Sequence, residues 1–154
     1  MSLRGNHAVR TRSSGAAALE FAIVLPILLA MVIGIVYFGV VLAMQQVLTL
    51  AAEEGARAAL RYPAGATGNN AAATQALRVS AASATALATL PASIRNAVSS
   101  SNVAQTVACA NPGGSVCVKV TLNLPSGAIL PVVPGVPMPA TLTGSATVQL
   151  APDT

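Results

Sequence analysis

The sequence predicts an α+β protein with a long N-terminal transmembrane helix, a second alanine-rich helix and a small antiparallel β-sheet. Three observations carry this prediction: an uncharged apolar run near the N-terminus, an alanine-rich stretch, and a final third in which apolar residues recur at every second position. Only 8% of the 154 residues are charged, against about 25% in an ordinary soluble domain. The composition therefore argues against a plain cytosolic globular protein.

The apolar run covers residues 21–44, FAIVLPILLAMVIGIVYFGVVLAM. It exceeds the roughly 20 residues that a helix needs to cross a hydrocarbon core of about 30 Å. In lipid the backbone must satisfy its own hydrogen bonds, and the run lacks the alternation of a barrel strand. The prediction is therefore a transmembrane helix, with Pro26 removing one backbone donor near its start.

Basic residues set the expected orientation. Arg4, Arg10 and Arg12 lie within about 15–20 residues of the span, where positive charge is retained in the cytoplasm. We therefore expect a single-pass protein with its N-terminus inside and the residues after about 45 exported. The alternative is a cleaved secretory signal ending at Val41-Leu42-Ala43, although the run exceeds the roughly 7–15 apolar residues of such signals.

The segment ahead of the run, RSSGAAALEF at residues 12–21, combines two features. Glu20 places a carboxylate at the edge of an apolar helix, where an ion is costly and tends to mark function. Gly15 lies five residues earlier, behind a short basic leader. A purely structural alternative is that Glu20 sits in the headgroup region as a favourable acid near a helix N-terminus.

This junction resembles the site that prepilin peptidases recognise: a glycine, four residues, a glutamate and an aromatic residue, followed by an apolar span. The resemblance implies cleavage between Gly15 and Ala16, with Glu20 and Phe21 just inside the mature chain. Cleavage would create an ammonium group at Ala16. The Glu20 carboxylate of one subunit could pair with the ammonium of its neighbour, which offsets part of the cost of burying an ion.

The first helix is expected to continue beyond the membrane through residues 45–62, QQVLTLAAEEGARAALRY. Glu53 and Glu54 precede Arg57 by four and three residues, spacings that favour ion pairs of about 0.2–0.5 kcal/mol each. Gly55 costs roughly 1 kcal/mol of helix stability relative to alanine. It indicates either a close neighbour on that face or a tolerated glycine in a solvated helix end.

Together with GAAALEFAIVLPILL, the EGARAA segment at residues 54–59 resembles the TadE-like minor pilins of the tight-adherence (Tad, Flp-type) pilus system. The stretch GSATVQL at residues 144–150 adds weaker support. The resemblance implies a minor pilin or pseudopilin in the assembly or initiation of a Tad/Flp type IV-like pilus for adhesion and surface colonisation. Incorporation into the fibre and priming alone both stay open, as does the subgroup within the Tad system.

The implied partners are a prepilin peptidase, other pilins and minor pilins, and the inner-membrane assembly platform. The implied location is the bacterial inner membrane, with the C-terminal domain in the periplasm or in an extracellular pilus. The expected organisation is a leader (1–15), a membrane-spanning and extended helix (16–62) and a periplasmic α+β head (63–154). The alternative function is an exported periplasmic binding domain with a Sec signal or simple membrane anchor and no pilus role.

In the head, Pro63 and Gly65 are expected to end the first helix, and Asn70 is a suitable N-cap for a second helix over residues 71–90. Residues 94–101 are expected to form a short helical turn and then a loop. The predicted packing stripe of the second helix comprises Leu77, Ala81, Ala84, Ala88 and Pro91, with Leu87 beside it.

Apolar and polar residues alternate over residues 116–124, which form the clearest strand. Residues 103–109 and 142–150 are its expected antiparallel partners, with a turn at residues 111–114. The proline-rich residues 125–139 are expected to form a loop, because proline cannot donate to a sheet ladder. This apolar loop is either a partner surface or a connection laid back over the helices.

Cys109 and Cys117 flank the turn, and in an oxidising compartment a disulfide between them is expected. It would close a short loop and add about 2–3 kcal/mol of stability. Two free thiols or a redox pair are the alternatives. If the cysteines face each other, Val107 shares the face of Lys119, so we expect a bulge or a bridge outside the regular ladder.

The residue inventory argues against catalysis. The only histidine is His7 in the leader, and the only acid after Glu54 is Asp153. We therefore expect no catalytic residues, no metal or cofactor site and no small-molecule substrate. Basic residues after position 55 are scattered and lack interleaved aromatics, which argues against nucleic-acid binding.

Overall fold

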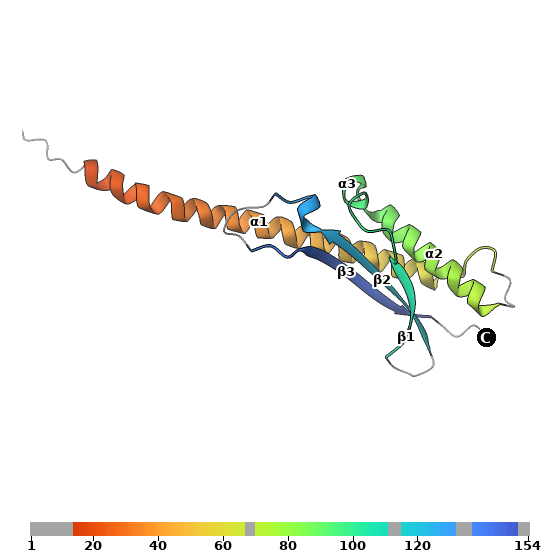
Figure 1. Cartoon of the computed structure of the whole chain (residues 1–154). Coiled ribbons are helices and arrows are strands. Elements are labelled where there is room, and N and C mark those ends of the chain that lie inside the picture. Colours follow the sequence, from red (N-terminus) through yellow and green to blue (C-terminus); the bar gives the residue numbers. More distant parts are fainter. Residues whose placement is uncertain (1–13, 67–69, 111–114, 132–136, 151–154) are drawn as a thin grey trace, which may run out of the picture. The chain divides into compact units, whose positions relative to one another are not determined.

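The computed structural model describes residues 14–66, 70–110, 115–131 and 137–150. The chain forms two compact units, Met1–Gly39 and Val40–Thr154. The predicted α+β fold is confirmed (Figure 1). In chain order the elements are α1 (Ser14–Leu60), α2 (Ala71–Thr89), α3 (Ala92–Arg95), β1 (Ala104–Ala108), β2 (Val116–Pro125), the short 3₁₀ helix η1 (Ser126–Ala128) and β3 (Thr141–Gln149).

The described part of the first unit is the α1 segment from residue 14 to residue 39. Most of its large apolar side chains are exposed, whereas Tyr37 is buried; Phe21 and Ile27, for example, are 64% and 68% accessible. The most apolar window of α1 has a mean hydropathy of 2.8. A helix that is apolar all round suits lipid rather than water. By length and composition it is compatible with a single-pass membrane anchor.

The sheet has the order β1-β2-β3, and both pairs are antiparallel. Ala104 lies opposite Val120 in the first pair, and Leu122 lies opposite Gly144 in the second. The central strand and its two partners are therefore as predicted. Alternation along β2 buries one face of the sheet, where Val118, Val120, Leu122 and Leu124 are inaccessible to solvent.

Within the second unit, the α1 residues from 40 to 60 provide the surface on which the sheet packs. Leu48 is fully buried, and Gly144 of β3 lies directly against it. A Cβ atom added to Gly144 would lie 2.6 Å from the carbonyl oxygen of Leu48 and 2.6 Å from the backbone nitrogen of Thr49. The glycine therefore lets two backbones approach more closely than any side chain would permit.

Helix α2 begins as predicted, because the Asn70 side chain accepts a hydrogen bond from the Ala73 N–H at 3.0 Å. The predicted packing stripe, however, is wrong. The buried residues of α2 are Thr74, Arg78, Ala82 and Ala86. The predicted stripe residues Leu77, Ala84, Ala88 and Pro91 are exposed, and Ala81 and Leu87 are half-buried.

The reason is the neighbour that α2 meets. Ala82 and Ala86 pack against Gly55 of α1, where only small side chains fit. The close contact between the two helices therefore selects the smallest residues, and the more apolar Leu77 is left 38% exposed.

The connection after β2 is more regular than predicted. Pro125 still belongs to β2, opposite Thr141, and η1 follows it. The Ser126 hydroxyl donates to the carbonyl oxygens of Pro139 and Ala140, at 2.6 and 3.0 Å. The middle of the loop (132–136) and the predicted turn at 111–114 lie outside the described residues.

Candidate functional site

The predicted processing site lies at the start of α1. Gly15 and Ala16 belong to its first turns, and a Cβ atom on Gly15 would meet nothing within 4 Å. Glu20 follows Ala16 by four residues, so the two lie on one helix face. Glu20 and Phe21 are both exposed along the helix surface. Residues 1–13 of the predicted leader (1–15) lie outside the described residues.

Of the two adjacent acids Glu53 and Glu54, only Glu54 forms an ion pair with Arg57 among the described residues. Arg57 Nη1 lies 3.3 Å from Glu54 Oε1, with both side chains at least half exposed. Glu53 is exposed and forms no ion pair within the described ranges. An exposed pair contributes about 0–1 kcal/mol. The charges of this segment therefore add little to the stability of the head.

Gly55 has a larger role, because it is the position of α1 against which α2 packs. A Cβ atom on Gly55 would lie 2.7 Å from the backbone oxygen of Ala82 and 2.7 Å from the Cβ of Ala86. Of the two alternatives for this glycine, the structure selects the close neighbour over the solvated helix end.

Arg78 of α2 was not identified from the sequence. Its side chain is 6% exposed, and its guanidinium carbon lies 5.8 Å from the ring centroid of Tyr62, within cation–π range. An arginine in an alanine-rich helix normally reads as a solvated residue, so only its place in the stripe of Ala82 and Ala86, four residues apart, could have indicated burial.

Cys109 and Cys117 lie at disulfide distance, with Sγ atoms 2.01 Å apart and Cα atoms 5.2 Å apart. Cys117 is opposite Val107 in the ladder, so the pair is diagonal. Cys109 follows the last residue of β1, and its N–H donates to the Ser115 carbonyl oxygen at 3.2 Å. Of the two predicted geometries, a bulge or a bridge outside the regular ladder, the structure has the second.

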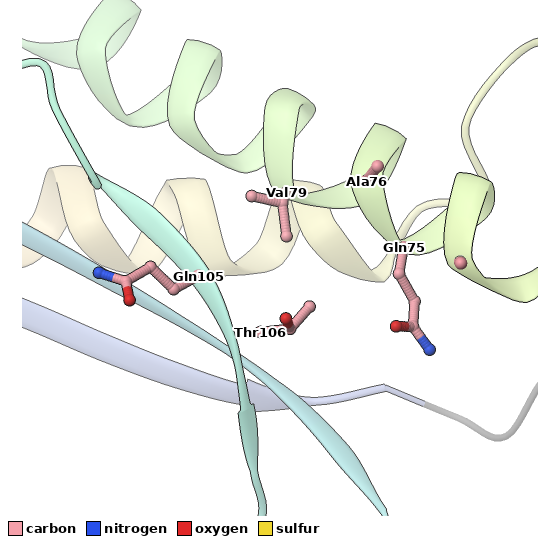
Figure 2. A pocket seen from close by; sticks show the side chains of 6 residues that line it. Gln75, Ala76, Val79, Gln105 and Thr106 are labelled. Carbon is pink, nitrogen blue, oxygen red and sulfur yellow. The ribbon is translucent and has the colours of Figure 1, made fainter.

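A shallow groove of about 430 Å³ runs between α2 and β1 (Figure 2). Its lining comprises Ala72, Gln75, Ala76, Val79, Gln105 and Thr106. These side chains offer amides, a hydroxyl and apolar surface but no titratable group. Among the residues that the structure describes, no group of three or more His, Cys, Asp or Glu side chains could hold a metal ion.

The N-terminal segment, which holds the predicted cleavage motif, the lipid-compatible helix and Gly55, matches a known family. Residues 15–57 match the family model described as TadE-like protein. The chain is TadE-like over this segment. The match begins at the glycine of the predicted cleavage site and ends at the arginine that pairs with Glu54.

The TadE-like match bears out the resemblance and associates the chain with the Tad pilus system. The residues beyond Arg57, which include the whole head, are outside the matched range. Neither comparison with curated proteins nor comparison with solved structures gives a match. The role of the head is therefore argued from its own geometry.

Proposed function

We propose that this TadE-like protein is a minor pilin or pseudopilin in the assembly or initiation of a Tad/Flp pilus for adhesion and surface colonisation. It is made as a precursor, trimmed between Gly15 and Ala16 by a prepilin peptidase, and held in the inner membrane by α1. Its head lies in the periplasm, where the oxidising environment suits the Cys109–Cys117 pair. The protein acts by contact with other pilins and the assembly platform, without catalysis or a cofactor.

One observation carries this proposal: Gly15 and Glu20 stand five residues apart at the start of a long apolar helix, inside the family-matched segment. Trimming releases an ammonium group at Ala16. Copies inserted in the same direction hold their Ala16 and Glu20 groups at similar depths in the membrane. A carboxylate is costly there unless a cation faces it. Pairing between neighbours therefore sets the register of adjoining helices.

The first test is the N-terminus of the mature protein. In cells that contain the peptidase, we expect the chain to begin at Ala16, as read by N-terminal sequencing and intact mass. The Gly15→Leu variant is expected to retain Met1, because a large side chain replaces the glycine that the peptidase recognises. Gly34→Ala is the matched control, since a Cβ at Gly34 meets nothing within 4 Å.

Two outcomes of this test contradict the proposal. An intact Met1 in the wild-type protein would remove the processing step. A start near Met44 would indicate a secretory signal and support the alternative, an exported binding domain with no pilus role.

The second test addresses the carboxylate. Glu20→Gln keeps the size of the side chain and removes its charge, so cleavage is expected to continue while piliation falls strongly. The measurement is the amount of surface pili per cell beside the N-terminal sequence of the same protein. Glu53→Gln is the control, because Glu53 is exposed and outside the membrane-spanning segment. Normal piliation in the Glu20→Gln strain would refute the ion-pair role.

A further inference from the structure

The face of the sheet opposite its buried valines and leucines is mostly polar and carries a single charge. Alternate positions of the strands supply its side chains, which on β2 include Lys119, Thr121 and Asn123. Lys119 is the only charged residue of the three strands. It lies opposite Gln105 of β1 and Thr147 of β3, so its cross-strand neighbours are an amide and a hydroxyl group.

Neither usual role of a strand lysine accounts for Lys119. A lysine on an edge strand blocks pairing with another sheet, but β2 is the central strand and both of its edges are paired. A lysine can also pair with an acid across the ladder. Within the described ranges Lys119 forms no ion pair, and the only acid of the sequence after Glu54 is Asp153. The ammonium group therefore lies exposed among hydroxyl and amide groups.

A hollow of about 460 Å³ includes Lys119 in its lining. Its other lining residues belong to β1, to β2 and to the loop that precedes β1. Two hydrogen bonds of 3.3 Å hold this loop: the Ser99 N–H donates to the Asn123 carbonyl oxygen, and Gln105 Nε2 donates to the Asn102 carbonyl oxygen. The hollow is therefore built by local contacts and lies within one compact unit.

The lining of this hollow defines the chemistry of a ligand. Seven of its eight residues are polar, and six of these seven carry hydroxyl or amide groups, which both donate and accept hydrogen bonds. A matching ligand must donate and accept at several positions, as the hydroxyl groups of a sugar do. The Lys119 ammonium only donates and is positively charged, so it favours an anionic group on that ligand. Val107 offers an apolar surface for the C–H groups of a sugar ring.

We propose that this hollow binds an acidic sugar, with its carboxylate on the Lys119 ammonium and its ring hydroxyl groups on the surrounding amides and hydroxyls. The volume lies within the roughly 300–1,000 Å³ of small-ligand sites. Most of the lining side chains are exposed, so water competes for the same hydrogen bonds, and we expect a dissociation constant of about 1 mM. The inference names a target class for the adhesion in the proposed function and rests on that function for its biological role.

The test is a titration of the detergent-solubilised full chain, followed through its backbone amide chemical shifts. The probes are methyl glucuronide, methyl glucoside, which lacks the carboxylate, and sodium sulfate, which lacks the ring. We expect methyl glucuronide to cause saturable shifts at residues 99–105 and 119–123. Methyl glucoside and sulfate are each expected to bind at least about tenfold more weakly, because each loses one part of the contact.

Variants separate the charge from the hydrogen bonds. Lys119→Gln is expected to lower the affinity for methyl glucuronide at least about tenfold and to leave that for methyl glucoside unchanged, whereas Lys119→Arg retains both. Arg95→Gln is the matched control, because Arg95 is an exposed cation outside the hollow. Thr121→Val removes one hydroxyl group and is expected to weaken both sugars about two- to tenfold. Unchanged amide shifts at the buried residues of β2 show that each variant is folded.

Three results would overturn the inference. Without saturable shifts on addition of methyl glucuronide, the hollow is not a sugar site. Equal affinities for methyl glucuronide and sulfate would mean an adventitious anion only. Equal binding of methyl glucuronide by the wild-type protein and Lys119→Gln would remove the role of the ammonium group. Because the titration contains neither peptidase nor other pilins, failure here leaves the N-terminal cleavage test and the piliation test of the proposed function standing.

Discussion

Gly144→Ala is expected to destabilise the head by about 3 kcal/mol or more, beyond the usual cost of overpacking a core. The added methyl group would collide with the backbone carbonyl of Leu48 and the backbone nitrogen of Thr49. Neither obstacle is the flexible end of a side chain, so β3 must move as a whole. The free energy of opening can be read from amide exchange of β2 in the detergent-solubilised full chain, because β2 lies at the centre of the sheet.

Gly127→Ala is the glycine control for this experiment. A Cβ at Gly127 meets nothing within 4 Å, so its substitution is expected to change the free energy of opening by less than about 0.5 kcal/mol. Ser145→Ala serves as the strand control, since Ser145 is exposed in β3. Equal opening free energies for Gly144→Ala and Gly127→Ala would contradict the close packing of β3 on α1.

Gly55→Leu is expected to detach α2 from α1, with a loss of about 3 kcal/mol or more. Leucine favours helix more than glycine by several tenths of a kcal/mol. On a free helix surface the substitution would therefore stabilise α1. At Gly55 the side chain must displace the Ala82 carbonyl and the Ala86 methyl group, so the sign reverses. Amide exchange within α2 measures the loss.

The control for this second experiment is Gly39→Leu, a glycine of the same helix with nothing within 4 Å of its Cβ position. It is expected to be neutral or slightly stabilising. A double-mutant cycle between Gly55→Ala and Ala86→Gly should give a coupling of about 0.5–3 kcal/mol, because Ala86→Gly removes the methyl group that a Cβ at Gly55 would meet. A coupling near zero would place α2 elsewhere on α1.

The strands were predictable because alternation reports burial directly. Each inward residue of β2 is a valine or leucine, and each outward residue from Lys119 to Asn123 is polar. The second helix was predictable for a different reason: alanine favours the helix, and Asn70 supplies its N-cap. In both cases a local property decides the structure.

The packing face of α2 was not predictable in the same way. Hydrophobicity alone would place Leu77 in the contact with α1. The two helices approach so closely at Gly55, however, that only the small side chains of Ala82 and Ala86 fit there. Arg78 is buried in the same stripe, and its guanidinium carbon lies 5.8 Å from the centroid of the Tyr62 ring. Such a choice depends on the partner surface, which a single sequence does not display.

The residues of the candidate site differ in the same way: local motifs were predictable, and tertiary contacts were not. Gly15, Glu20 and the EGARAA segment were found as local motifs, and the family match covers Gly15, Glu20 and residues 54–57 of that segment. The packing of Gly144 against α1 was not predicted from the sequence. A glycine on the inward face of a strand is nevertheless the usual sign of close backbone approach. The diagonal geometry of Cys109 and Cys117 followed only once the register of β1 on β2 was known.

The contact between Leu48 and Gly144 joins helix α1 to the last strand of the head. During synthesis Leu48 emerges well before its partner Gly144. Contacts of such high sequence separation form late and slow folding. A nascent chain must therefore carry the apolar face of β2 and the open flank of α1 without their cover, which is the stage most exposed to aggregation. The emergence of β3 is the event that commits the head to its native state.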